Sequence, residues 1–455
     1  MARAIAHEQT FAIEALVFQN TEIAGRRGRD GQFYAEYAPA LPMAIAPLVA
    51  FADLFQSSVA DFGPNYHWMR GRENDVLERI FVSYFDIAVV AATAGVLVLL
   101  VMRLGYSEPR AIFIGAIFAL STFAWGQARI INPEPLQTFL IVSSFLLTLG
   151  ATGKSSFVGG CALGCAALAK LTSVLGVPSL LILLNSRKTT ISSKVLTAAM
   201  AVLPVFGALA IYAFYNYARF GNVFAIGYNV SGRAAELGGN GVGNPLIGFY
   251  GLLFSSGRGL IWYAPPVLAA VLGYRDFLRE KKTAAIAVAL FVAFWIALHS
   301  CYQGWDSGWG WGPRYLLPIL PFMVLPMAEA VKRRLGRIIC VTLAIVGFFI
   351  QIPGASIDFM ASGRAGMVLF GETTHERSAA AFVSWRNFYI EGSEIVRHFA
   401  LLKEGKFDFA WATFRHSSLS QITFCLVIIL ILSGALLIVS TLRAQRRLER
   451  SPTKE

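Results

Sequence analysis

The chain has 455 residues, of which 56% are hydrophobic and only 15% are charged, and its mean hydropathy is +0.58. A soluble protein of this length could not bury that much apolar surface, so the composition excludes an ordinary soluble globular protein. The net charge of +12 would suit a protein that binds nucleic acid. The basic residues lie in short segments between apolar runs, however, which is the pattern of a membrane protein, so we expect no nucleic-acid partner.

The first 76 residues contain one apolar segment, Ala38–Phe55, which three prolines and Asp53 interrupt. We expect an amphipathic helix that lies on the outer membrane surface there. The alternative is that this segment spans the membrane, which would place the amino terminus in the cytoplasm. The first interpretation makes residues 1–76 an outer loop with surface helices.

Apolar runs of about 17 to 23 residues, each long enough to cross about 30 Å of hydrocarbon, follow from residue 77 onward. They predict membrane helices at 77–104, 110–126, 132–150, 155–171, 172–187, 195–216, 257–275, 284–300, 314–331, 337–353 and 421–443. The two short runs in 155–187 are expected to be half-buried helices that meet near Lys170. The chain is thus predicted to be an all-α polytopic membrane protein of about 11 transmembrane helices. Its core is 77–353, an extracytoplasmic segment covers 354–420, and 421–455 holds the last helix and a basic tail.

The basic residues assign the two sides of the membrane. Alternate connections carry the clusters Arg103 and Arg110; Lys154; Arg187, Lys188 and Lys194; Arg275, Arg279, Lys281 and Lys282; Lys332, Arg333, Arg334 and Arg337; and the tail from Arg443 to Lys454. Positive residues are retained in the cytoplasm, so these connections are predicted to be cytoplasmic. The opposite, extracytoplasmic face then holds the long polar segments 217–256 and 354–420. We expect a multi-pass membrane protein whose long polar segments lie on the periplasmic or extracytoplasmic side.

Several segments on the predicted outer face resemble one known family. They are "GRDGQFYAEYAPALPMAIAPL" (28–48), "ARIINPEPLQTFLIV" (128–142), "YNYARFGNVFAIGY" (215–228), "GLLFSSGRGLIWYAPP" (251–266) and "GWGWGPRYLLPILPF", which ends at Phe322. In order and spacing, over residues 1–330, they resemble the GT-C glycosyltransferases that use polyprenyl-phosphate-linked sugars. The resemblance implies a bundle of membrane helices that moves a sugar from the lipid phosphate to a hydroxyl of a cell-envelope glycan, glycolipid or protein.

The resemblance also implies an acidic pair after a first membrane helix, one member of which is the catalytic base. The chain opens on "MARAIAHEQTFAIEA", which is similar to the segment just after that pair. We therefore expect an upstream helix and acid that this chain lacks, or an inactive relative. Asp30 and Glu36 are the alternative candidates for the base. The competing functions are a transporter or flippase of a lipid-linked saccharide, and a lipid-binding relative without catalysis.

Four basic residues are candidate ligands of the donor phosphate. Arg314 follows "WGWGP" at an outer helix start, and its planar guanidinium suits phosphate oxygens. Lys170 lies within an apolar run, where a charged side chain is a functional candidate by default. Arg258 and His299 lie at the same predicted level. For Arg314, Lys170 and Arg258 the alternative role is snorkelling to the interface. For His299 the alternative is a structural role.

Four further residues are candidates for contacts with the sugar or the acceptor: Glu134, Asp306, Tyr34 and Trp309. Glu134 lies in "NPEP", where Pro133 and Pro135 predict a helix start, so its alternative role is a favourable charge at that terminus. Asp306 is alternatively a solvated loop acid, and Tyr34, Trp305, Trp309 and Trp311 alternatively form an aromatic belt. The six histidines show no zinc-like spacing, so no metal site or cofactor is predicted. A divalent cation bound between an acidic side chain and the donor phosphate is the alternative that the sequence leaves open.

Overall fold

The computed structural model describes residues 1–13, 17–18, 21–22, 26–35, 37–56, 76–150, 152–185, 189–225, 241–308, 310–358, 376–409 and 428. The candidate residues Glu36 and Trp309 lie outside the described residues. So does the predicted last helix, 421–443, apart from residue 428, and the basic tail that follows it.

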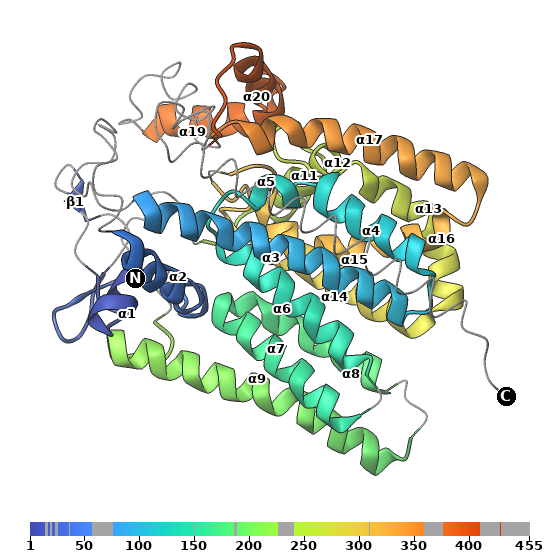
Figure 1. The fold of residues 1–455 in the computed structure, drawn as a ribbon, viewed down its shortest axis with the longest axis horizontal. Coiled ribbons are helices and arrows are strands. Elements are labelled where there is room, and N and C mark those ends of the chain that lie inside the picture. Colours follow the sequence, from blue (N-terminus) through green and yellow to red (C-terminus); the bar gives the residue numbers. More distant parts are fainter. Residues whose placement is uncertain are drawn as a thin grey trace.

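Four of the described helices are long and apolar enough to cross a membrane: α3 (Val76–Arg103, from Phe81 onward), α9 (Ile191–Phe220), α14 (Lys282–Ser300) and α17 (Arg334–Ser356). Shorter apolar helices accompany them, so the chain is a multi-pass helical membrane protein. In Figure 1, α3, α9 and α17 run along the long axis of the molecule.

The remaining helices are shorter. They are α1 (Ala2–Glu8), α2 (Ala40–Gln56), α4 (Glu108–Leu120), α5 (Ala124–Gln127), α6 (Pro133–Thr148), α7 (Gly153–Ala169), η1 (Leu171–Gly176), α8 (Val177–Asn185), α11 (Pro245–Phe254), α12 (Leu260–Tyr263), α13 (Pro266–Glu280), η3 (Arg314–Ile319), α15 (Leu320–Val324), α16 (Met327–Ala330), α19 (Glu376–Phe388) and α20 (Glu394–Lys403). Two small antiparallel sheets pair β1 (Val17–Phe18) with β2 (Thr21–Glu22) and β3 (Arg26–Arg27) with β4 (Phe33–Tyr34).

Three predicted helices are interrupted in the structure. The run 314–331 is not one helix but the sequence η3, α15 and α16, because Pro318, Pro321 and Pro326 lack the N–H groups that a continuous helix needs. The run 257–275 is α12 followed by α13, which begins at Pro266 and continues to Glu280. The run 110–126 is likewise divided into α4 and α5.

The predicted meeting of two short helices near Lys170 is confirmed. α7 ends at Ala169, Lys170 has an extended backbone (φ −157°, ψ 122°), and the 3₁₀ helix η1 begins at the next residue. Gln137 of α6 holds this break, since its Nε2 donates to Ser173 Oγ at 2.8 Å and to Thr172 Oγ1 at 3.0 Å.

Three basic connections converge at one end of the bundle. The Lys281 Nζ atom between α13 and α14 lies 5.8 Å from the ring centre of Tyr106, which lies between α3 and α4. The Lys332 Nζ atom between α16 and α17 lies 5.7 Å from the same ring. Figure 1 shows α1 and α2 at the opposite end. The predicted clustering of these cations at one face is therefore a feature of the fold.

The pair α7 and α9 packs through glycines. A Cβ on Gly160 would lie 2.1 Å from the carbonyl oxygen of Ala201, and one on Gly164 would lie 2.9 Å from that of Pro204. Spacing of small residues by four positions lets two membrane helices approach closely at their backbones.

Replacing Gly160 with alanine is expected to separate α7 from α9 and to lower the free energy of unfolding by about 1–3 kcal/mol, the usual cost of overpacking. The matched control is Gly207→Ala on α9, where nothing lies within 4 Å of the added Cβ. Thermal and denaturant unfolding of both variants in detergent measures the difference. Equal stabilities would contradict the packing at Gly160.

Candidate functional site

An aromatic column on α14 leads from the core to the site. Phe291, Trp295 and His299 follow one another at intervals of four residues, so they share one helix face. The ring centres of Phe291 and Trp295 are 5.4 Å apart, and those of Trp295 and His299 are 5.1 Å apart in a stacked arrangement. Trp295 Nε1 donates to the backbone oxygen of Tyr315 at 2.6 Å, and the His299 and Tyr315 ring centres are 5.4 Å apart. The column thereby positions Tyr315 at the start of η3.

Lys170 and Glu134 form an ion pair beside Tyr315. Lys170 Nζ lies 2.7 Å from Glu134 Oε1 and 4.0 Å from the centre of the Tyr315 ring. Glu134 lies in the first turn of α6, which Pro133 begins, as the sequence predicts. The positive end of the helix dipole and the ammonium both favour an ionised carboxylate there.

Arg314 and Asn132 connect the start of η3 to helix α3. The Nη1 atom of Arg314 donates to Asn132 Oδ1 at 2.8 Å, and the backbone N–H of Asn132 donates to Asp86 Oδ2 at 3.0 Å. The Arg314 guanidinium carbon also lies 5.5 Å from the Tyr315 ring centre. We refer to Asp86, Asn132, Glu134, Lys170, Arg314 and Tyr315 as the polar cluster.

The acids and the cations of the polar cluster differ in burial. Asp86 is fully buried and Glu134 is 1% exposed. The Lys170 side chain is 20% exposed, and Arg314 is half-buried. The accessible side of the cluster therefore presents two cations, an arrangement that suits an anion with several oxygens. Asp86 Oδ1 and Glu134 Oε2 are enclosed and accept no hydrogen bond from the described residues.

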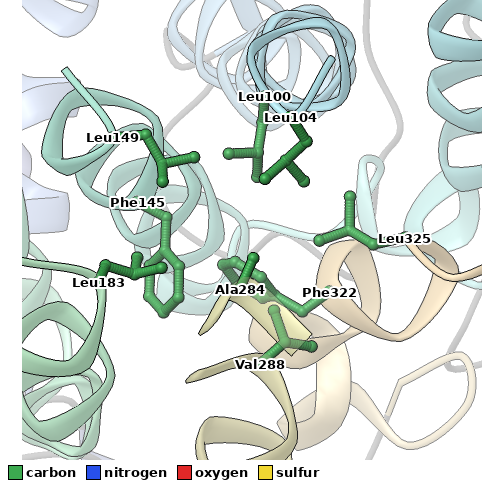
Figure 2. A pocket seen from close by; sticks show the side chains of 9 residues that line it. All are labelled: Leu100, Leu104, Phe145, Leu149, Leu183, Ala284, Val288, Phe322 and Leu325. Carbon is green, nitrogen blue, oxygen red and sulfur yellow. The ribbon is translucent and has the colours of Figure 1, made fainter. Parts of the chain in front are cut away.

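A small cavity of about 10 Å³ lies elsewhere in the helix core (Figure 2). Its lining is apolar and includes Leu100 of α3, Phe145 of α6 and Phe322 of α15. Leu100 comes 14 residues after Asp86 on the same helix, which corresponds to about 21 Å along its axis. This cavity is too small for a sugar and offers it no hydrogen-bonding group, so we do not assign it to the site.

Arg258 forms a second buried group. Its guanidinium is fully buried and forms a bidentate ion pair with Glu394 of α20. Nη2 donates to Oε1 at 2.8 Å, and Nη1 donates to Oε2 at 3.0 Å. The guanidinium also donates to the backbone oxygens of Gly308, Gly310 and Gly312. These contacts fix α20 and the loop 301–313 to each other. In this position Arg258 is engaged by protein groups, which favours a positioning role over its predicted contact with phosphate.

Asp306 joins the same loop to α19. Its Oδ2 accepts hydrogen bonds from Arg386 Nη2 and, at 2.9 Å, from Asn387 Nδ2. Burial alone would raise the pKa of Asp306, but the charges of Arg386 and Arg258 outweigh it and hold that pKa below its usual value. We refer to the contacts of Arg258, Glu394, Asp306 and Arg386 as the loop clamp.

Two loop tryptophans are buried rather than at a lipid or sugar surface. Trp311 is fully buried and packs against Gly126 and Gly354, where added Cβ atoms would lie 2.4 and 2.2 Å from its ring. Its Nε1 donates to Gln351 Oε1 at 2.8 Å. Trp305 is 8% exposed. These rings anchor the loop 301–313, which continues into Arg314.

His398 of α20 stacks on Trp311, with ring centres 5.0 Å apart, and burial lowers its pKa from 6.5 to about 4. An unfolded histidine becomes protonated near pH 6.5, whereas folded His398 becomes protonated only near pH 4. His398 therefore costs no free energy of unfolding above pH 6.5, and that free energy falls as the pH drops from 6.5 toward 4. We expect the free energy of unfolding to lose about 3 kcal/mol across this interval through His398. Measuring unfolding of the wild type and of His398→Gln from pH 7 to 4.5 isolates this contribution, and parallel curves would contradict it.

Asp30 and Tyr34 contact each other rather than the polar cluster. The Tyr34 hydroxyl donates to Asp30 Oδ2 at 2.6 Å, which lowers the pKa of the exposed Asp30. Burial, together with this bond, raises the pKa of Tyr34 to about 12. Nearby, Arg219 of α9 donates to the Ala35 backbone oxygen at 2.8 Å, which ties this segment to the end of α9.

The structure thus brings together three of the predicted site residues, Lys170, Glu134 and Arg314, and places His299 beside them through Tyr315. Sequence reasoning missed Asp86, although a lone carboxylate inside the apolar run of α3 is a recognisable signal. It also missed Glu394 and Arg386, which lie in the segment 354–420. Their partners are far away in sequence, so no local pattern could have revealed these pairs.

No known protein family matches the chain, and no curated protein matches it in sequence. Among solved structures, the chain is similar to the oligosaccharyltransferase of Archaeoglobus fulgidus, crystallised with an acceptor peptide that contains the NVT sequon and is tethered by a disulfide bond. The match has a TM-score of 0.40 and 10% sequence identity, and it covers 79% of this chain and 51% of the other. The chain spans about half the length of that protein, and so distant a likeness identifies no function.

Proposed function

We propose that this protein is an integral-membrane glycosyltransferase of a bacterial inner membrane that takes its sugar from a polyprenyl-phosphate donor and transfers it to an extracytoplasmic hydroxyl. The observation that carries the proposal is the polar cluster. In it, Lys170 and Arg314 are partly accessible cations at helix ends, Lys170 pairs with the buried Glu134, and Arg314 is linked through Asn132 to the buried Asp86. The outer-face segments that resemble GT-C glycosyltransferases support the same function.

Lys170 and Arg314 are the proposed ligands of the donor phosphate. Lys170 projects from the break between α7 and η1, and Arg314 begins η3, so both cations lie where helices end. An ammonium and a planar guanidinium together can contact several phosphate oxygens. As the sugar–phosphate bond breaks, negative charge grows on the phosphate, and these two cations would stabilise it more strongly in the transition state than in the bound donor.

The transfer step requires a proton acceptor. The acceptor oxygen forms a bond to the anomeric carbon, the bond from that carbon to the phosphate oxygen breaks, and polyprenyl phosphate leaves. The hydroxyl proton passes to a carboxylate and then to water. Glu134 pairs with Lys170, and we propose it for contact with the sugar or the acceptor. Asp30 and Glu36 remain the predicted alternatives for the base, and Asp86 is best suited to positioning Asn132 and Arg314.

The other predicted site residues would position the polar cluster or contact the sugar. His299 would orient Tyr315 under Lys170, and Asp306 would hold the loop that precedes Arg314. Tyr34 and Trp309 stay candidates for sugar contacts. We propose that the connections around Tyr106, which carry basic residues, face the cytoplasm and that the polar cluster faces the periplasm.

Purified protein in detergent or nanodiscs, supplied with a radiolabelled polyprenyl-phosphate sugar and an extract of cell-envelope glycans, glycolipids and proteins, tests the proposal. We expect label to move from the organic-soluble donor to an acceptor only when the protein is present. Donor binding without transfer would instead indicate a lipid-binding relative, and movement of intact donor between leaflets of a vesicle would indicate a flippase.

A further inference from the structure

A second group of charged side chains lies outside the polar cluster, at the junction of α1, α2 and α3. His7, Asp53 and Glu78 each offer one metal-ligating atom, and these three atoms all lie within 4.8 Å of one another. We propose that this junction binds a divalent transition-metal ion, of the class of Mn²⁺ or Zn²⁺, which links the amino-terminal helices to the first membrane helix.

The three ligands come from three separate helices that pack in sequence. His7 lies in the last turn of α1, Asp53 near the end of α2, and Glu78 in the first turn of α3. α1 packs against α2 and α2 against α3. The edge-to-face pair of Phe51 and Phe81, with ring centres 5.3 Å apart, fixes α2 against α3 close to the two carboxylates.

The three ligand atoms suit a metal ion that accepts both nitrogen and oxygen ligands. His7 Nε2 lies 3.2 Å from Asp53 Oδ2, close to the separation of two ligand atoms on one ion. One imidazole nitrogen with two carboxylate oxygens fits Mn²⁺ and Zn²⁺ better than Ca²⁺ or Mg²⁺, which take oxygen ligands. The exposed His7 and half-buried Asp53 leave a path for the ion, whereas the Glu78 side chain is 10% exposed and forms the floor.

Charge balance supports the same conclusion. Two carboxylates this close repel each other unless a cation lies between them or beside them. Arg3 supplies part of that charge, since its Nη2 lies 3.2 Å from Glu78 Oε1. A divalent ion would supply the rest, and Arg3 would then support Glu78 from outside the metal shell.

The test uses the tag-free full chain in detergent, stripped with chelator and titrated with Mn²⁺ while electron paramagnetic resonance measures the free ion, followed by competition with Zn²⁺. We expect about one Mn²⁺ per chain, displaced by Zn²⁺. His7→Ala and Glu78→Gln should each weaken the affinity about tenfold or more. Glu8→Gln, a neighbouring exposed acid on α1, is the matched control and should bind as the wild type does.

Absence of Mn²⁺ and Zn²⁺ binding to the wild type would overturn the proposal and leave an ion-pair network of Arg3, His7, Asp53 and Glu78. Binding that His7→Ala, Asp53→Asn and Glu78→Gln all retain would also overturn it. Size-exclusion profiles confirm that each variant is folded, and the exposed position of His7 makes His7→Ala the safest of the three. The titration needs no transferase activity, so its result is independent of the proposed function.

Discussion

Replacing Arg314 with alanine is expected to lower the rate of sugar transfer from a polyprenyl-phosphate donor by about 10²–10³-fold, the usual cost of removing one donor to a developing anion. The reason is that Arg314 lies on the accessible side of the polar cluster, where it would meet the leaving phosphate. Arg314→Lys keeps the charge but loses the planar fork, so its rate should lie between those of the alanine variant and the wild type. Initial rates at saturating donor measure the effect.

The matched control is Arg333→Ala. Arg333 is also an arginine in an ion pair, 2.7 Å from Asp276 Oδ2, but it is 73% exposed and belongs to the basic end of the bundle. Its loss should leave transfer unchanged. If Arg314→Ala folds normally and transfers sugar as fast as the wild type, Arg314 is not a ligand of the phosphate.

Replacing Arg258 with methionine is expected to lower the free energy of unfolding by about 3–5 kcal/mol, because it leaves the buried carboxylate of Glu394 without its partner. Glu394→Gln should have an effect of the same sign, since the Arg258 charge then remains buried. The double variant should cost less than the sum of the two, because neither charge is left alone. Denaturant unfolding in detergent, followed by tryptophan fluorescence, gives the three values.

A second ion pair joins the same carboxyl-terminal segment to the core and serves as the control. Arg129 Nη2 lies 2.9 Å from Asp408 Oδ2, but the Asp408 side chain is 50% exposed. Asp408→Asn should therefore cost no more than about 1 kcal/mol. Equal effects of Asp408→Asn and Glu394→Gln would show that the loop clamp does not hold the fold.

Hydropathy and charge predicted the helical membrane class and most of the helix positions, because each membrane helix must satisfy its own backbone and present apolar side chains. Local chemistry predicted the start of α6 at Pro133 and the helix break at Lys170. The prolines in 314–331 also carried a local signal, and treating that run as one helix gave hydropathy too much weight over the missing N–H groups.

The assembled site was harder to predict. The pairing of Lys170 with Glu134 joins residues 36 positions apart, and that of Arg258 with Glu394 joins residues 136 apart. Such contacts depend on how helices pack, which a single sequence does not specify. Arg258 and Arg314 both looked like interfacial cations, and only the fold separates the buried one from the accessible one.

The most direct test of the central claim is the affinity of the purified protein for polyprenyl phosphate, measured by native mass spectrometry for the wild type, Lys170→Met and Arg314→Ala. Our account predicts that one lipid phosphate binds the wild type, that each substitution weakens binding about tenfold or more, as expected for a lost charge-assisted contact, and that unphosphorylated polyprenol does not compete. Equal binding of polyprenol and polyprenyl phosphate, or full affinity in both variants, would contradict it.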